Sequence, residues 1–74
     1  MADKVRIGVI DIYPIFRDAI VRAVTRAEDL VVVAEGESAE DAIRIARRCD
    51  VLLIESAVPN SLKAAKAVLE NTPK

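Results

Sequence analysis

Three short apolar runs mark the chain and are separated by stretches in which apolar residues recur at longer spacing. The runs are Val5–Ile10, residues 30–34 and Val51–Ile54, each rich in valine, isoleucine or leucine and bounded by polar residues. Runs of this length are too short for helices and are typical of buried parallel strands. We therefore predict a strand over each of the three.

The stretch after the first run has the pattern of an amphipathic helix. It begins at Pro14, because a missing N–H costs nothing in a first helical turn. Its apolar positions, one or three residues apart, are Ile15, Phe16, Ala19, Ile20, Ala23, Val24 and Ala27. We expect Phe16 in the core and an Asp18–Arg22 ion pair on the outer face.

Two further helices follow the second and third runs. Ser38 with Asp41 three residues later resembles a capping box, and it places a helix start there. After Pro59, either Asn60 or Ser61 can cap the last helix. The apolar residues of these two helices are Ala39, Ala42, Ile43, Ala46 and Cys49, then Leu62, Ala65, Val68 and Leu69. The last helix is expected to fray at Thr72 and Pro73.

Strict alternation of strands and helices predicts an α/β fold in three layers around a parallel sheet. The order is strand, helix, strand, helix, strand, helix. At 74 residues the chain has room for one small domain, and we predict that residues 1–74 form one partial domain with no second.

Composition narrows the classes of function. The net charge is −1, from 11 basic and 12 acidic residues, so no general attraction to nucleic acid or to an anionic membrane is expected. The apolar runs fall far short of the roughly 20 residues that a membrane helix needs. There is no histidine, and Cys49 is the single cysteine. A reducing cytoplasm is the expected compartment.

Two carboxylates follow neighbouring strands of the predicted sheet. Asp11 ends the first run and Glu55 ends the third. Ligands of open parallel sheets bind beyond the carboxyl ends of the strands, and carboxylate oxygens suit a hard cation such as Mg²⁺. The alternative is that both acids only cap loops and face water.

Two segments resemble the receiver domains of two-component response regulators. Residues 9–17, VIDIYPIFR, are similar to the opening signature of CheY-like receivers attached to LuxR/NarL-type regulators. Residues 50–59, DVLLIESAVP, resemble the third strand with its terminal phosphoacceptor and the following proline. The resemblance covers residues 4 to about 70. It implies a flavodoxin-like fold, a role in phosphorelay signalling, and a sensor kinase or an output domain as protein partner.

The chain departs from the family's pattern at its expected site. Glu55 stands in place of the phosphorylated aspartate, Ile12 replaces the second acidic metal-site residue, and Tyr13 replaces a histidine. The expected acidic pocket holds Asp11 and Glu55 and is lined by Ile12, Tyr13 and Pro59. With Asp11 as the remaining metal residue, Mg²⁺ binding should be weak, and no cofactor is expected. We expect a non-enzymatic module that is not phosphorylated; the alternative is a phosphorylatable or phosphomimetic receiver of a DNA-binding regulator.

The resemblance reaches only the first half of a receiver domain. The missing strands would leave the third strand as an exposed apolar edge, which invites pairing. We therefore expect a homodimer that hides this edge and the uncovered apolar faces. The alternative is that the 74 residues are a fragment of a longer regulator.

Overall fold

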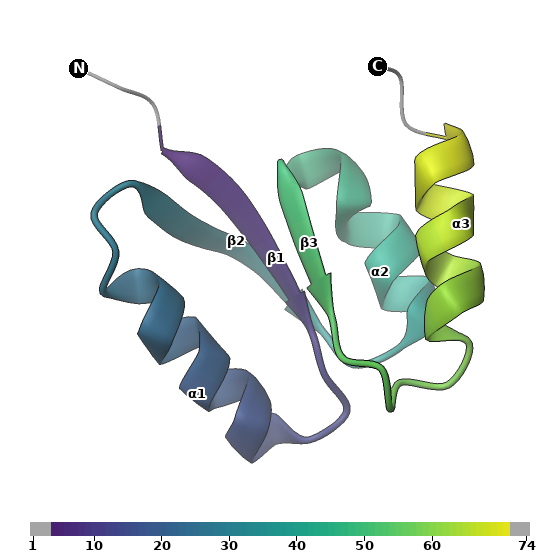
Figure 1. Ribbon diagram of the computed structural model, residues 1–74, viewed down its shortest axis with the longest axis horizontal. Coiled ribbons are helices and arrows are strands. Elements are labelled where there is room, and N and C mark those ends of the chain that lie inside the picture. The colour runs from purple at the N-terminus through teal and green to yellow at the C-terminus, as the bar shows by residue number, and fades with distance from the viewer. Residues whose placement is uncertain (1–3, 72–74) are drawn as a thin grey trace.

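The computed structural model describes residues 4–71 and has the predicted alternation of strands and helices (Figure 1). In chain order the elements are β1 (Val5–Ile10), α1 (Pro14–Thr25), β2 (Leu30–Gly36), α2 (Ala39–Ile45), the 3-10 turn η1 (Ala46–Arg48), β3 (Val51–Ile54) and α3 (Ser61–Asn71). The bounds of β1 and β3 are those of their apolar runs. The expected fraying at Thr72 and Pro73 lies outside the described residues.

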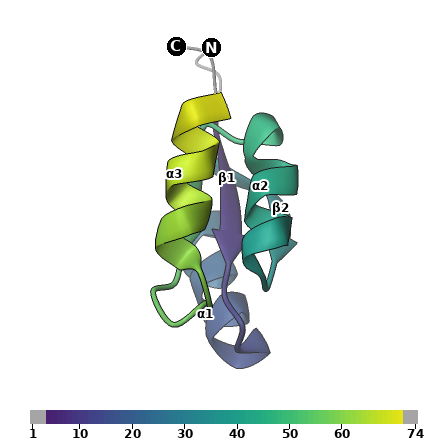
Figure 2. The same ribbon diagram turned by 90° about the vertical axis from the view of Figure 1, so that its right-hand side faces the viewer.

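The three strands form one parallel sheet in the order β2-β1-β3. Helix α1 covers one face, and α2 and α3 lie side by side on the other (Figures 1 and 2). This is the three-layer α/β arrangement that the sequence predicted. Within residues 4–71 the sheet is three strands wide, and this part of the chain is accordingly flat, with extents of 35 × 32 × 14 Å. The two edge strands, β2 and β3, therefore lie at its two broad sides.

Pairing with β1 decides where each edge strand begins and ends. β3 pairs in unbroken register, from Ile7 opposite Val51 to Ile10 opposite Ile54. β2 continues two residues past the predicted end at position 34, because Glu35 and Gly36 pair with the last two residues of β1. The predicted strand ended too early because the prediction followed the apolar residues, and backbone pairing does not require apolar side chains.

The main core lies between the sheet and the α2–α3 layer. Its buried members are Ile10, Ala42, Ile45, Val58 and Ala64. Because side chains alternate along a strand, Ile10 faces this layer and the buried Val9 faces α1. Two thin apolar layers on opposite faces thus hold the central strand.

The expectation that Phe16 belongs to the core is wrong. Its side chain is 59% exposed, and no residue of α1 is fully buried. The ring packs edge-on against Tyr13, with the centroids 5.8 Å apart. Helix α1 covers β1 and β2, and Phe16 lies on the part of the helix that faces toward β3, where no other described element packs over it.

The predicted helix starts are observed, with one difference in the hydrogen bonds at the start of α2. Ser38 Oγ accepts a hydrogen bond from Asp41 N at 3.1 Å. The Asp41 carboxylate accepts from Glu37 N at 3.0 Å rather than from Ser38. Helix α3 begins at Ser61, and Asn60 before it has φ of 64°, a left-handed conformation that asparagine tolerates better than most residues. The predicted Asp18–Arg22 pair is present at 3.2 Å.

Candidate functional site

Asp11 directly follows β1 and is almost completely buried, with 1% of its surface exposed. Its Oδ1 accepts a hydrogen bond from Tyr13 N at 2.9 Å, which closes a tight turn at the start of the β1–α1 loop. Its carbonyl oxygen accepts from Arg17 Nη1 at 2.6 Å. Arg17 also forms an ion pair with Glu35 Oε1 at 3.5 Å. The loop after β1 is thereby tied to helix α1 and to the end of β2.

Glu55 follows β3 and is half-buried. Its backbone N–H donates to Ile10 O at 3.0 Å, which continues the pairing with β1 by one step. Its side chain turns back on its own loop, where Oε1 accepts from Ala57 N at 2.6 Å. One oxygen of this carboxylate therefore already has a strong donor within the chain, since ionised acceptors make short hydrogen bonds.

Asp11 and Glu55 line one cavity of about 490 Å³ at the carboxyl ends of β1 and β3. The remaining walls come from α1 and from the loops after the two strands, and they are mostly apolar. The lining residues besides the two acids are Tyr13, Phe16, Ala19, Ile20 and Ala57. The arrangement is a pair of carboxylates at the end of an apolar groove, in a position where parallel sheets bind ligands.

Of the three residues expected to line the acidic pocket, the structure places Tyr13 with Asp11 and Glu55. Ile12 and Pro59 instead line a separate cavity of about 510 Å³ beside the start of α2. The reason is apolar burial: Ile12 packs against the core under α2, on the opposite side of the loop from Tyr13. The Asp11–Tyr13 turn fixes these opposite directions.

Four residues of the acid-lined cavity were not predicted to belong to it: Phe16, Ala19, Ile20 and Ala57. Phe16, Ala19 and Ile20 follow the i, i+3, i+4 spacing of one helix face, and this spacing was read as core. The pattern identifies a shared face correctly. It does not tell whether that face meets a protein layer or a groove.

The residues present do not fit a magnesium site. Across residues 4–71 no three carboxylate, cysteine or histidine side chains gather in a way that could hold a metal ion. Asp11 and Glu55 provide two carboxylates, and each accepts a backbone N–H. The position where a third acid would stand carries Ile12, which packs on the core. Mg²⁺ needs several oxygen ligands in near-octahedral geometry.

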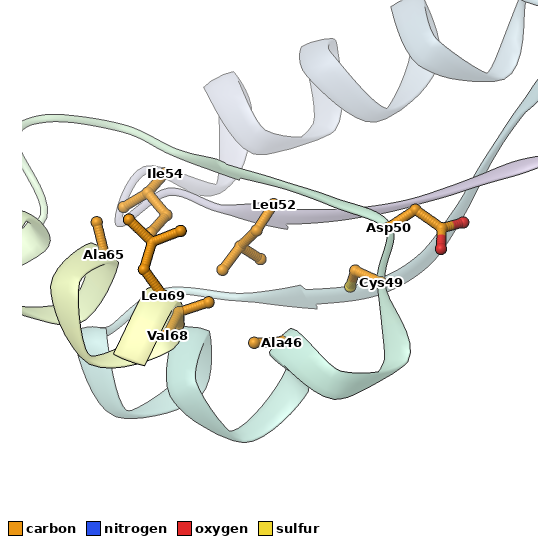
Figure 3. Close-up of a pocket in the computed structure, with 8 residues that line it drawn as sticks. All are labelled: Ala46, Cys49, Asp50, Leu52, Ile54, Ala65, Val68 and Leu69. Atoms are coloured by element: carbon orange, nitrogen blue, oxygen red, sulfur yellow. The ribbon is translucent and has the colours of Figure 1, made fainter. Parts of the chain in front are cut away.

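A second groove lies on the other face of β3 (Figure 3). Its volume is about 340 Å³, and its lining is mainly apolar. Leu52 and Ile54 of β3 form one wall, Val68 and Leu69 of α3 lie across from them, and Cys49 lies toward the η1 end. Cys49 is a free, half-buried thiol whose pKa is raised by burial. Cavities with mostly apolar walls thus lie against one face of β3 and beyond its carboxyl end.

Similarities to known proteins fit this geometry. No protein-family model matches the chain. The transcriptional regulatory protein DegU of Brevibacillus brevis is 28% identical over 96% of this chain and 32% of its own length. The signal receiver domain of the response regulator NarL from Mycobacterium tuberculosis superposes with a TM-score of 0.86 at 30% identity. That match covers 93% of this chain and 59% of the receiver chain.

A two-component response regulator of the LuxR family from Aurantimonas sp. SI85-9A1 matches with a TM-score of 0.83 at 26% identity, over 92% of this chain and 51% of the other. The chain has the receiver fold of LuxR/NarL-type response regulators. The flavodoxin-like architecture and the resemblance drawn from residues 9–17 and 50–59 are confirmed. The chain spans about a third of the curated relative and between half and three-fifths of the two solved structures.

In the described part of the chain, no helix is both long enough and apolar enough to cross a bilayer.

Proposed function

We propose that this chain is a receiver-type module that is not phosphorylated and that acts through protein–protein contact. The observation that carries the proposal is the Glu55 carboxylate, which stands at the end of β3 and accepts the Ala57 amide at 2.6 Å. A glutamate at this position is one methylene longer than an aspartate. A displacement of about 1 Å in a reacting group can lower a rate by roughly 100-fold.

The surroundings of Glu55 support the same proposal. Transfer of a phosphoryl group relies on a metal ion and on positioned charge to neutralise the group in flight. Ile12 offers neither charge nor a ligand and packs away from the acid-lined cavity. Asp11 alone would hold Mg²⁺ weakly. We therefore propose a non-enzymatic role in two-component signalling that requires no cofactor.

Intact-mass spectrometry after incubation with acetyl phosphate and Mg²⁺ tests this function. We expect the mass of the wild-type chain to stay unchanged, while a phosphorylatable receiver domain in the same mixture gains a phosphoryl group. A wild-type chain that gains one would refute the proposal. Glu55→Asp shortens the acid alone, and Ile12→Asp with Glu55→Asp also adds the second carboxylate. A mass gain in the double variant would show that Ile12 and Glu55 are the residues that prevent phosphorylation.

A second candidate is a receiver whose Glu55 imitates a phosphorylated aspartate within a DNA-binding regulator. The Glu55–Ala57 hydrogen bond favours it, because the carboxylate holds the β3–α3 loop in one conformation. The name of the DegU relative, a transcriptional regulatory protein, points the same way. One carboxylate charge is weaker than the nearly two charges of a phosphoryl group. Glu55→Gln keeps the shape and removes the charge; a changed loop spectrum by NMR would support this candidate.

The partners we propose follow from the fold. A sensor kinase or an output domain is one class, and a second copy of the chain, bound through the β3 edge, is the other. We further propose a cytoplasmic location and no direct contact of this segment with nucleic acid or membrane, in line with a net charge of −1.

A further inference from the structure

Arg17 links three segments that meet where β1 and β2 end. Its Nη1 donates to Asp11 O at 2.6 Å, and its Nε lies 3.5 Å from Glu35 Oε1. The Arg17 side chain is only 20% exposed. A guanidinium group can bind two acceptors at once, because its donors have fixed directions. From its position on α1, Arg17 therefore connects the β1–α1 loop with the last part of β2.

Helix stability does not explain an arginine at this place on α1. Arg17 is the fourth residue of the helix, which begins at Pro14, and its backbone N–H donates to Tyr13 O at 2.9 Å. Cations are unfavourable near the start of a helix, where the helix dipole is positive. No acidic residue lies in the first turn of α1 to offset this charge. The contacts to Asp11 and Glu35 offset it instead.

The peptide group after Asp11 decides where the Asp11 carboxylate points. Asp11 N donates to Gly36 O at 3.1 Å, and Asp11 Oδ1 accepts from Tyr13 N at 2.9 Å. The bond from Arg17 fixes the carbonyl group between these two contacts. Without it the peptide group between Asp11 and Ile12 could rotate, and the tight turn that Oδ1 closes with Tyr13 would open. A bond of 2.6 Å from a charged donor that is largely shielded from water is strong.

Glu35 orients Arg17 from outside the acid-lined cavity. Its side chain is 48% exposed, and it is not among the residues that line this cavity. An ion pair of 3.5 Å with an exposed partner is weak. It still restricts the guanidinium group to a direction in which Nη1 reaches Asp11 O. All of these contacts lie between β1, α1, β2 and the loop after β1, and none of them involves β3 or α3.

We propose that Arg17 is a positioning residue for the acid-lined cavity and that Glu35 controls it. Arg17 holds the Asp11 carboxylate in its place in the cavity, and Glu35 holds Arg17. A partner whose basic side chain pairs with Glu35 at the exposed end of β2 would compete with Arg17, and would so act on the cavity without entering it. This inference rests on the contact function proposed above and adds a means of regulating the same site.

Amide hydrogen exchange of the 74-residue chain, followed by NMR, tests the proposal, because Tyr13 N donates directly to Asp11 Oδ1. We expect Arg17→Ala to speed up exchange at the Tyr13 amide by at least about tenfold, since a hydrogen bond from a charged group is lost. The amides inside β1 should exchange as in the wild type. Arg22→Ala is the matched control, because Arg22 is an exposed arginine of the same helix that pairs with Asp18. It should leave Tyr13 exchange unchanged.

Two milder variants separate positioning from general support of the fold. Arg17→Lys keeps the charge but lacks the two-sided guanidinium group, so its Tyr13 exchange should fall between those of the wild type and Arg17→Ala. Glu35→Gln keeps the size and removes the charge of an exposed side chain. It should speed up Tyr13 exchange by about two- to fivefold, the size expected from an exposed ion pair. Because a surface substitution of this kind rarely unfolds a chain, the test holds even if Arg17→Ala does not fold.

Tyr13 exchange at the wild-type rate in Arg17→Ala or in Glu35→Gln would overturn the proposal. Equal acceleration of the Tyr13 and β1 amides would also overturn it, since that result means a general loss of stability and not a local release of Asp11. Intact mass after incubation with acetyl phosphate keeps the two proposals apart. A chain that gains a phosphoryl group but shows these exchange changes refutes only the proposed function. An unmodified chain with unchanged Tyr13 exchange in the variants refutes only the role of Arg17.

Discussion

The β2 and β3 edges of this sheet have the same neighbour, β1, but reach stability by different means. β2 has seven residues, a bulge and an arginine from η1 that satisfies one of its carbonyl groups. β3 has four apolar residues; one groove lies against Leu52 and Ile54, and the acid-lined cavity lies beyond the carboxyl end of the strand. An edge strand with its own protection can face water, whereas an unprotected apolar edge favours a partner. The comparison separates an edge that the described residues protect from one that they leave unpaired.

The candidate site lies at the carboxyl ends of β1 and β3. Glu55 extends the β3 pairing by one hydrogen bond, and the cavity that it shares with Asp11 continues along the exposed face of α1. A partner that covers the β3 edge would therefore also approach the acid-lined cavity.

The largest effect on stability is expected from a change at the contact between β1 and the segment that runs from η1 to β3. A side chain at Gly8 would displace its neighbours: an added Cβ would lie 2.5 Å from Cys49 Sγ and 2.9 Å from Leu52 Cδ1. Gly8→Ala should lower the free energy of unfolding by about 1–3 kcal/mol, as overpacking does. Urea unfolding followed by circular dichroism measures it.

Cys49→Ala provides the control for Gly8, because it removes the nearest atom. The double variant Gly8→Ala with Cys49→Ala should be less destabilised than the sum of the two single variants predicts. Strictly additive losses would show that the crowding at Gly8 does not come from the η1–β3 segment.

A smaller effect should appear in acid, where one carboxylate before β3 and one in the α2 helix that follows β2 have a low pKa. The Arg6 guanidinium and backbone N–H lower the pKa of Asp50, just before β3, to about 2. The backbone N–H of Glu37 and then the Arg44 side chain lower the pKa of Asp41, in the first turn of α2, to about 2. An unfolded aspartate titrates near pH 4. The stabilisation is therefore complete above about pH 4 and is lost as the pH falls toward 2.

The variants Asp50→Asn and Asp41→Asn measure how much each carboxylate contributes to the free energy of unfolding. The wild-type chain should have a higher urea midpoint than either variant at neutral pH, and the difference should shrink between about pH 4 and pH 2. Both carboxylates are on the surface, so the differences will be modest. A difference that stays constant down to pH 2 would mean that these acids do not stabilise the chain through their charge.

The smallest effect is expected at the protected edge. Arg48→Ala removes the donor to Val33 O and should cost no more than about 1 kcal/mol, as for an exposed hydrogen bond. Amide exchange in β2 should become faster. Arg47→Ala is the matched control, a neighbouring exposed arginine of η1. Equal effects of the two variants would show that the Val33 contact does not protect the edge.

Much of the fold could be predicted from local patterns. The apolar runs gave the bounds of β1 and β3, and Ser38 marked the start of α2, because these signals depend on residues close in sequence. The end of β2 could not be predicted, since Glu35 is held in the strand by pairing with Val9. Phe16 was assigned to the core because helical spacing reports a shared face and not what lies opposite it.

The candidate site divides in the same way. That Asp11 and Glu55 follow neighbouring strands could be inferred from the alternation of elements, because right-handed crossovers bring the carboxyl ends of parallel strands to one end of the sheet. That Ile12 and Pro59 line another cavity was decided by a turn and by packing on the core.

The sequence by itself determined the order of the elements, the three-layer class and the two acids at the strand ends. Only the tertiary structure decided that one edge is bulged and bonded to Arg48, that the other is bare, and that Glu55 turns back on Ala57. The physical reason is the distance along the chain over which each effect acts. Apolar periodicity and capping act within a few residues, whereas edge protection and cavity shape arise from contacts between residues far apart in the chain.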